Sequence, residues 1–472
     1  MRGLRLVPLA IVASIAASCS QGASDATTRA ATSAPPSPIA GASTSPTAGA
    51  SPVTTPADWP TYHHDSARTG AANEVAGFSG VDPAWQTDVL SGDVYAEPLV
   101  VSGEVIVATE RNTVYAFDVT SGAQHWRAVL GAPVNAGTLP CGNITPVTGI
   151  TGTPVVDTKA GVVYVVAFEQ PAHHELYAID LASGVVRYHR AIDPPGADPR
   201  VHQQRAALAL ANGNVYVAYG GLAGDCGNYH GWVVGAPAGA AKGELLVYQV
   251  PARREGGIWA PSGIAADANG RLFVVTGNSD SSGTYDYNDA VLRLAPDLTV
   301  EDYWAPTNWL ALSRSDTDIG STGPTLIGSG MIVEAGKNGI LYLLRADRLG
   351  GIGGEAQKLQ VCGEVFGGFA AAAGVVYVPC SDGVAAVRVT TDETMRVLWR
   401  GPRSASGPPI VAAGALWVTD PNTGALFAID LSSGRVRFER SLGAMQHFTT
   451  PTAFRDLILV AAGGRVVALR VH

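Results

Sequence analysis

One phrase returns along this chain: an apolar alternating run, an Asp, a Ser-Gly turn and a second run. It reads TVYAFDVTSGAQHW at 113–126, ELYAIDLASGVVRY at 175–188 and ALFAIDLSSGRVRF at 425–438. An aromatic residue follows the Gly by four positions in each copy (Trp126, Tyr188, Phe438). Apolar alternation on both sides of a tight turn predicts two short antiparallel strands. Repeats at a period of tens of residues indicate an array in which no unit buries its own core.

The repeats predict an all-β fold, an eight-bladed β-propeller with four antiparallel strands (A to D) in each blade. Units of roughly 40–50 residues follow one another from about residue 95. The last unit, 447–472, supplies only strands A to C, and residues 79–90 read like the missing strand D. An N-terminal strand that completes the C-terminal blade closes the ring and protects its sheet edges. A seven-bladed ring or an open solenoid is the alternative.

The first 18 residues read as the signal peptide of a bacterial lipoprotein. Arg2 and Arg5 precede an apolar stretch that is too short to span a bilayer comfortably, and the stretch ends Ala-Ala-Ser-Cys. Cys19 is therefore the expected lipidation site, and an ordinary signal peptide with a chance Cys is the alternative. We expect an exported protein that is lipid-anchored on the outer face of a bacterial membrane, at the cell surface or on the periplasmic side.

The sequence predicts three parts: the signal peptide over 1–18, a disordered tether over 19–58 and the propeller over 59–472. The tether is rich in Ala, Ser, Thr and Pro and has no aromatic residue, so it cannot bury a core. The net charge is −9 and no basic cluster stands out, which argues against a nucleic-acid partner. We expect a monomer that contacts the membrane through its lipid anchor only.

Four cysteines follow Cys19, and an even number in an exported protein implies disulfides, with three possible pairings. In a propeller the D–A and B–C loops open on one face. On that face Cys141 precedes strand A of blade two and Cys226 follows strand B of blade three, while Cys362 and Cys380 bracket strands A and B of blade six. We predict the pairs Cys141–Cys226 and Cys362–Cys380. A metal site is the weaker alternative, because there is no CxxC and no His at ligand spacing.

The same face carries the long loops, and long loops on one side of a rigid scaffold are where binding usually occurs. Polar residues stand at the expected start of strand A in blade three, where other blades have small residues and Pro. A nearby loop and the expected start of strand A in blade four add aromatic residues. The predicted ligand pocket at the channel mouth comprises His202, Gln203, Arg205, Tyr229, His230 and Trp259. The alternative is a ring of polar groups that stabilises a wet channel.

Three further sequence features give weaker indications of a functional site than the polar residues of blade three do. Asp280, Asp286 and Asp289 share one loop and are a candidate calcium site, although Asp is also a common turn residue. Lys337 follows a Gly at a B–C turn, where a solvated lysine is expected. The motif WPTYHHDSARTG at 59–70 is expected to clamp the closed ring, and a contribution to a site is the alternative.

The sequence contains no GxSxG, P-loop, HExxH or CxxCH motif and no recognisable pair of nucleophile and base. The phrases LYAIDLASG and LFAIDLSSG, the opening WPTYHHDSARTG and ITGTPVVD at 150–157 resemble the PQQ-like β-propeller repeat proteins over about 59–472. That family includes quinoprotein dehydrogenases and outer-membrane assembly lipoproteins of the BamB type. The resemblance implies pyrroloquinoline quinone (PQQ) and calcium as possible cofactors. The adjacent cysteine pair of the alcohol dehydrogenases is missing here, and their calcium ligands cannot be placed on this chain.

These observations favour a lipid-anchored extracytoplasmic propeller that binds a small molecule, a polymer or envelope proteins and carries out no chemistry. Neither the cofactor nor any catalytic residue is identified. The alternative is an enzyme, a PQQ- and calcium-dependent dehydrogenase of an alcohol, a sugar or a polymer. An enzyme of that kind needs a quinone-sized cavity with a base and a metal, whereas a binding protein needs only a shaped rim or groove.

Overall fold

A computed structural model describes residues 58–72, 77–281 and 283–472 of the chain. The expected signal peptide, the lipidation site Cys19 and the tether up to residue 57 lie outside the described residues. The chain divides into the units Met1–Val53 and Thr54–His472, and only the second is considered below. In the part that the structure describes, no helix is long and apolar enough to cross a bilayer.

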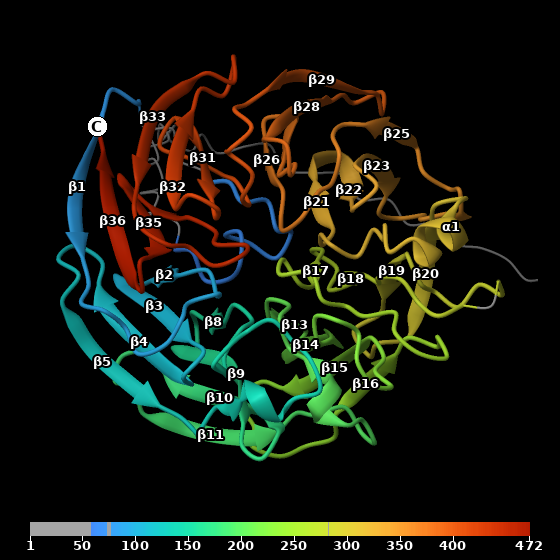
Figure 1. The fold of residues 1–472 in the computed structure, drawn as a ribbon, viewed down its shortest axis with the longest axis horizontal. Coiled ribbons are helices and arrows are strands. Elements are labelled where there is room, and N and C mark those ends of the chain that lie inside the picture. The colour runs from blue at the N-terminus through green and yellow to red at the C-terminus, as the bar shows by residue number, and fades with distance from the viewer. Residues whose placement is uncertain (1–57, 73–76, 282) are drawn as a thin grey trace, which may run out of the picture. The chain divides into compact units, whose positions relative to one another are not determined.

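Eight antiparallel sheets are arranged in a ring (Figure 1), which confirms the eight-bladed β-propeller and rules out seven blades. The N-terminal strand β1 (Val81–Gln86) closes the ring by pairing with the last strand, β36 (Arg465–Val471). In this pair Val81 lies opposite Val471, and Gln86 lies opposite Val467. The outer strand of blade eight therefore comes from the other end of the propeller sequence, as the incomplete last repeat predicts.

Each blade runs from an inner strand A beside the channel to an outer strand D. The strands of blades one to four are β2 (Leu99–Val101), β3 (Glu104–Thr109), β4 (Thr113–Asp118), β5 (Gln124–Val129); β8 (Val155–Asp157), β9 (Val162–Glu169), β10 (His173–Asp180), β11 (Val186–Ala191); β13 (Ala209–Ala211), β14 (Asn214–Gly221), β15 (Trp232–Pro237), β16 (Leu246–Gln249); β17 (Ala265–Ala266), β18 (Leu272–Val275), β19 (Val291–Leu294), β20 (Val300–Ala305).

Blades five to eight continue in the same order. Their strands are β21 (Thr325–Ile327), β22 (Met331–Ala335), β23 (Ile340–Arg345), β25 (Gln357–Gln360); β26 (Ala370–Ala372), β27 (Val375–Val378), β28 (Ala385–Val389), β29 (Met395–Arg400); β30 (Ile410–Ala412), β31 (Ala415–Asp420), β32 (Ala425–Ile429), β33 (Val436–Ser441); β34 (Thr452–Phe454), β35 (Leu457–Ala462), β36 and β1.

Short elements lie in the loops between and within blades. They are β6 (Val134–Asn135), η1 (Ala136–Thr138), β7 (Val147–Thr148), η2 (Pro199–Val201), β12 (His202–Gln203), α1 (Trp309–Arg314), η3 (Gly328–Gly330) and β24 (Gly351–Ile352). Strand β12 pairs with β14, and β24 adds a parallel fifth strand to blade four. Strands B and C are almost fully buried, because both of their faces pack against neighbouring blades.

The aromatic residue after the repeated turn joins one blade to the next. Trp126 on β5 of blade one donates from Nε1 to the carbonyl oxygen of Leu181 at 2.9 Å, in the turn of blade two. Its ring lies over Gly184, where an added Cβ would approach ring carbon Cδ2 at 2.6 Å. Trp85 over Gly122 and Trp399 over Gly434 repeat the arrangement. The Ser-Gly turn thus needs Gly for two reasons, its positive φ and the indole above it.

We expect Gly184→Ala to lower the free energy of unfolding by about 2–4 kcal/mol, since the new Cβ adds overpacking to left-handed strain. Gly161→Ala is the matched control in the same blade. Its φ of +62° is similar to the +72° of Gly184, but the nearest atom to its added Cβ is 3.9 Å away. Denaturant unfolding followed by tryptophan fluorescence measures both. Equal losses would show that the Trp126 contact contributes nothing.

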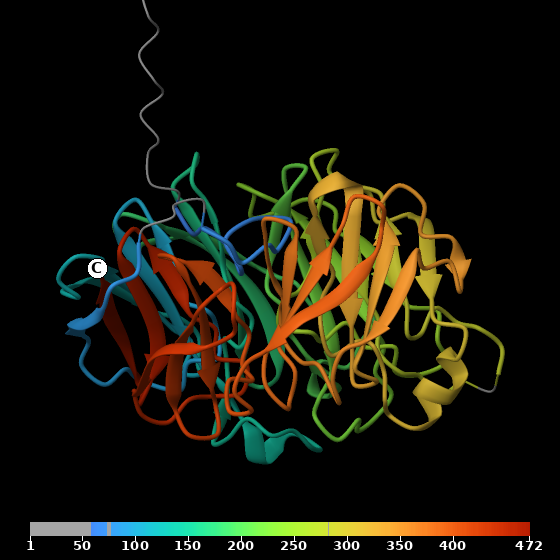
Figure 2. The same ribbon diagram turned by 90° about the horizontal axis from the view of Figure 1, so that it is seen from above.

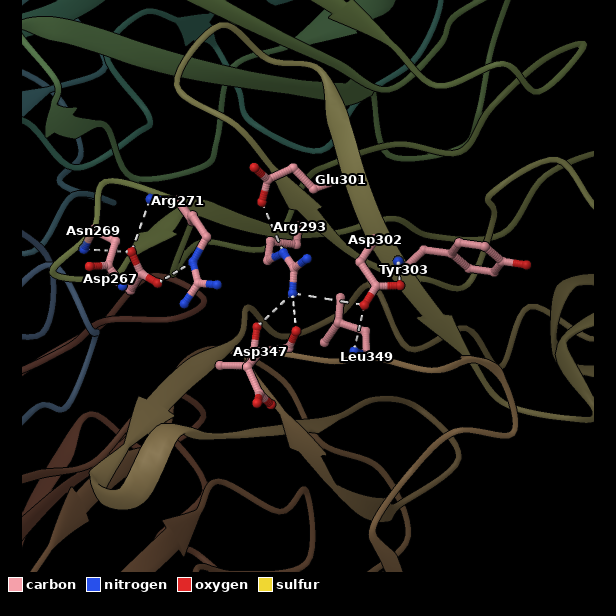
Figure 3. Close-up of polar contacts among 10 residues, drawn as sticks. Asp267, Asn269, Arg271, Arg293, Glu301, Asp302, Tyr303, Asp347 and Leu349 are labelled. Carbon is pink, nitrogen blue, oxygen red and sulfur yellow. Dashed lines mark hydrogen bonds and ion pairs between the residues drawn. The ribbon is translucent and has the colours of Figure 1, made fainter. Parts of the chain in front are cut away.

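Polar contacts between blades four and five are centred on Arg293 of β19 (Figure 3). Its guanidinium donates to Glu301 Oε2 at 3.0 Å within blade four. It also donates to the carbonyl oxygens of Ala346 and Asp347, at 3.0 and 2.7 Å, just after β23 of blade five. The backbone N–H of Leu349 donates to Asp302 Oδ2 at 2.7 Å. Five-donor geometry suits Arg to this position between carboxylates and carbonyls.

Residues 59–72, here called the plug, make hydrogen bonds to every blade. Backbone bonds join Trp59 to Val100, Pro60 to Val156, Ser66 to Ala266, Ala67 to Leu326, Thr69 to Ala371 and Gly70 to Val411, and side-chain bonds join Arg68 to Leu208 and Tyr62 to Thr450. All but the last two of these blade residues lie in strand A. The expected clamp is therefore an element that crosses one end of the channel. In the edge-on view of Figure 2 the plug lies toward one face, and α1 projects from the other.

Candidate functional site

A pocket of about 300 Å³ opens at the channel mouth, on the face opposite the plug. Its walls come from D–A loops and B–C loops of several blades. The side chains that matter below are those of Asn143, Arg205, Asp225, Trp259, Asn278, Asp316, Lys337 and Phe448. Of the six residues predicted for a pocket, Gln203, Arg205, Tyr229 and Trp259 line this one. The structure thus brings four of them together and adds partners from blades five and eight.

His202 and His230 line a neighbouring pocket of about 420 Å³ beside blade three. His202 Nδ1 lies 2.8 Å from the carbonyl oxygen of Asp198, and Nε2 accepts from the backbone N–H of His230 at 3.3 Å. Burial lowers the pKa of His202, which keeps the ring neutral. Both ring nitrogens are engaged in the loop, so this His holds the loop's conformation.

The expected positions within strand A are wrong in blades three and four. Strand A begins at Ala209 in blade three and at Ala265 in blade four, so Gln203, Arg205 and Trp259 belong to the preceding D–A loops. The physical reason is length: the inner strands of these two blades have only three and two residues, so the residues before them belong to the loop. The side chains still reach the mouth, since D–A loops open on that face.

The expectation of a solvated lysine at position 337 is wrong, because the side chain of Lys337 lies in the pocket wall. Its side chain is 17% exposed, and its Nζ lies 2.6 Å from Asp316 Oδ1 and 2.7 Å from Asp318 Oδ2. The same nitrogen lies 5.8 Å from the centroid of the Trp259 ring. Burial opposes the charge on Lys337, but the charge of Asp318 outweighs it and the pKa is raised. The lysine is a fixed cation at the pocket wall.

A second cation lies beside a second aromatic ring. The guanidinium carbon of Arg205 is 5.7 Å from the centroid of Phe448, and Nη2 donates to Asn143 Oδ1 at 3.3 Å. Burial lowers the pKa of Arg205, yet the group stays charged at neutral pH. The pocket therefore presents two pairs of a cation and an aromatic face, Lys337 with Trp259 and Arg205 with Phe448.

Three non-glycine residues that line this pocket have a left-handed backbone conformation. Asp225, Asp316 and Phe448 line it with φ values of 51°, 52° and 67°. Asp tolerates the left-handed region, but a bulky aromatic residue there is a genuine outlier. Strain of this kind persists where the surrounding structure imposes it, and it is typical of functional sites.

Both predicted disulfides are confirmed, Cys141–Cys226 and Cys362–Cys380. The first joins the D–A loop that carries Asn143 to the B–C loop that carries Asp225, and both residues line the pocket. The second joins the ends of a short segment of blade six. Two disulfides indicate an extracytoplasmic protein, because such bonds persist in oxidising compartments.

The three candidate calcium ligands each have a separate partner. Asp280 pairs with Arg253, Asp286 accepts from Ser279 Oγ at 3.0 Å, and Asp289 accepts from the backbone N–H of Ile319 at 3.1 Å. Among the described residues, the one group of three His, Cys, Asp or Glu with ligand atoms close together is Cys362, Cys380 and Asp382, whose cysteines form a disulfide. The structure does not bring the three predicted carboxylates to a common point.

Comparison with known proteins agrees with this architecture. Residues 73–219 match the family model described as outer membrane protein assembly factor BamB. Similar solved structures include a quinohemoprotein alcohol dehydrogenase from Comamonas testosteroni (16% identity, TM-score 0.67, 88% of this chain and 80% of that one) and a europium-containing methanol dehydrogenase (13%, 0.67, 89% and 99%). BamB from Moraxella catarrhalis is also similar (14%, 0.56, 83% and 100%). No curated protein matches the chain.

The eight blades and the family match over residues 73–219 agree with the predicted resemblance to the PQQ-like β-propeller repeat proteins. Identities of 13–16% carry the fold and not the activity. The dehydrogenase resemblance implies a quinone and a calcium ion, and the residues of this pocket suit the quinone but not the ion. Arg205 and Lys337 suit the carboxylates of a quinone such as PQQ, and Trp259 suits its flat ring. Calcium does not fit, because Asp316 and Asp318 already share the ammonium of Lys337.

Proposed function

We propose that this chain is a lipid-anchored extracytoplasmic binding protein that holds a small, flat, anionic ligand at its channel mouth. The observation that carries the proposal is the presence of two cation–aromatic pairs in one pocket. A flat ring can lie against Trp259 while its carboxylates meet Lys337 and Arg205. The lipid anchor at Cys19 rests on the sequence of residues 1–19 alone.

The plug supports the idea of a closed receptor site. Hydrogen bonds to all eight blades hold the plug across the far end of the channel, which favours entry of a ligand from the loop face. A pocket of this size with a few charged groups at its wall is typical of small-molecule sites.

PQQ itself, a flat tricarboxylate, is the probe for a first test. We expect PQQ to raise the melting temperature of the wild-type protein in EDTA by several degrees, since a ligand that binds only the folded state stabilises it. Arg205→Ala should weaken binding at least tenfold. Arg200→Ala is the matched control, because Arg200 is exposed and pairs with Asp198 away from the pocket. No shift at millimolar PQQ or at millimolar simpler aromatic dicarboxylates would contradict the proposal.

A dehydrogenase is the second candidate, and the similar solved structures favour it. Its test is the reduction of an artificial dye with PQQ, calcium and an alcohol or sugar. Steady dye reduction that Lys337→Ala abolishes would establish an enzyme. The match to the BamB family model supports envelope proteins as further partners of the same propeller, which co-purification from membranes under crosslinking tests.

The disulfide beside the pocket gives a sharper prediction. We expect Cys141→Ser with Cys226→Ser to lower the affinity for PQQ about tenfold, because two loops that line the pocket lose their crosslink. Cys362→Ser with Cys380→Ser is the control, since it removes a disulfide outside the pocket lining. Isothermal titration measures the affinities of both double variants. Equal losses in the two would mean that general loosening, and not the pocket loops, is responsible.

A further inference from the structure

The cation at the pocket wall occupies a position made by two carboxylates from one D–A loop. Lys337 lies on the B–C turn of blade five, and its Nζ is 2.6 Å from Asp316 Oδ1 and 2.7 Å from Asp318 Oδ2. Asp316 is largely exposed, whereas Asp318 is completely buried. The third side of the ammonium faces the ring of Trp259.

Asp318 needs a counter-charge at this position. A buried carboxylate without a partner is strongly unfavourable, and removal of one partner of a buried pair is costly. The neighbouring carboxyl group of Asp289 is also completely buried, and it accepts from Ile319 N and from Asn288 Nδ2 instead of from a cation. Lys337 is therefore the positive charge that pairs with Asp318.

Two carboxylate oxygens flank the ammonium of Lys337, at distances ordinary for an ion pair. Calcium binds oxygen ligands at about 2.3–2.6 Å, often with amide oxygens and water beside carboxylates. An ion at the position of Nζ would have two carboxylate oxygens within a few tenths of an ångström of such distances. Asn278 lines the same pocket and offers an amide oxygen nearby.

We infer that Lys337 takes the place of a divalent cation in this propeller, so the pocket binds its ligand without metal. Shortening this side chain then uncovers a site for calcium between Asp316 and Asp318. The ligand half of this inference rests on the proposed function, whereas the metal half depends on the chain's own residues and is tested without any ligand.

The test measures ion binding to the ligand-free protein. Terbium is the probe, because it replaces calcium at oxygen sites and its emission is sensitised by a nearby indole, here Trp259. We expect little sensitised emission from the wild-type protein and at least tenfold tighter terbium binding by Lys337→Ala, with displacement by calcium. The melting temperature of Lys337→Ala should rise with calcium, whereas that of the wild type should not change with calcium or EDTA.

Two variants keep the test decisive. Lys358→Ala is the matched control, because Lys358 pairs with Glu355 at 3.1 Å and Glu355 also accepts from Trp304 Nε1. It should gain no terbium emission. Lys337→Gln serves if the Ala variant does not fold, since it removes the charge with less change in volume. Tight calcium binding by the wild type, or a folded Lys337 variant without any ion response, would overturn the inference. Failure of PQQ to bind would leave these ion measurements unaffected and would count against the proposed function alone.

Discussion

Replacing Arg68 by Ala is expected to lower the free energy of unfolding by at least about 3 kcal/mol, because buried carbonyl groups then lose their donors. The Arg68 side chain donates to the carbonyl oxygens of Tyr62, Leu208 and Ile264, each at 3.0 Å, and to Thr61 Oγ1 at 2.6 Å. The residue is only 1% exposed, and burial lowers its pKa to about 10, so it remains charged. One side chain thus ties the plug to blades three and four.

Guanidinium unfolding measures the effect, and two variants control it. Arg68→Lys keeps the charge but not the planar fork of donors, so it should recover only a small part of the loss. Arg127→Ala removes an exposed arginine from β5 and should change stability by less than about 0.5 kcal/mol. A loss below 1 kcal/mol in Arg68→Ala would show that the plug is not an integral part of the folded ring.

The second large effect is a fall in stability as the pH rises from about 6.5 to 8. Burial raises the pKa of Glu97 to about 8, although it accepts hydrogen bonds from Trp59 Nε1 at 2.9 Å and from His63 N at 2.8 Å in the plug. A carboxyl group with a raised pKa in the folded state favours folding at low pH, and that contribution is lost as the pH rises through the folded pKa. Between pH 6.5 and 8, ionisation of Glu97 lowers the free energy of unfolding by about 2 kcal/mol.

His63 sets the lower limit of that window. Burial lowers its pKa to about 3, so its contribution is fully present above about 6.5 and is lost as the pH falls. Below pH 6.5 the two groups therefore change the free energy of unfolding in opposite directions as the pH changes. Above pH 6.5 only Glu97 of this pair makes stability depend on pH. Burial raises the pKa of Glu110 to about 7 and those of Glu334 and Asp289 well above their usual values, which adds slope of the same sign.

Glu97→Gln isolates the contribution of Glu97. The amide stays uncharged at every pH, as the protonated form of Glu97 does below its raised pKa. Its diagnostic effect is on the slope, which should decrease by about 2 kcal/mol over the window. Glu110 accepts from the backbone N–H of Gly149 and not from the plug. Glu110→Gln should reduce the slope of stability with pH by less than half as much as Glu97→Gln. An unchanged slope in Glu97→Gln would mean that Glu97 is ionised throughout this range.

The architecture follows from local sequence because each repeat contains its own pairing signal. The turn Gly and the aromatic residue four positions later fix strands C and D, and the incomplete last repeat together with 79–90 predicts the closure by β1. The disulfides were predictable for the same reason, since the face on which a cysteine lies depends only on the strands beside it.

The candidate site was only half predictable because its parts come from distant blades. Arg205 and Trp259 stand out where other blades have small residues, but Phe448 belongs to blade eight and resembles many core aromatic residues. Asp316 and Asp318 read as ordinary turn residues, and only closure of the ring places them around Lys337. One available signal was that Lys337 is one of only four lysines in the sequence and lies on the face with the long loops.

Closure of blade eight by β1 has a consequence for biogenesis. Strand β1 pairs with β36 across nearly the whole propeller sequence, so the most non-local contact of the ring cannot form while the chain is still threading through an export channel. Strand β1 therefore stays unpaired until β36 has been synthesised, and an unpaired strand is prone to aggregation during that interval. Truncation near the C-terminus therefore leaves the N-terminal strand β1 without its partner β36.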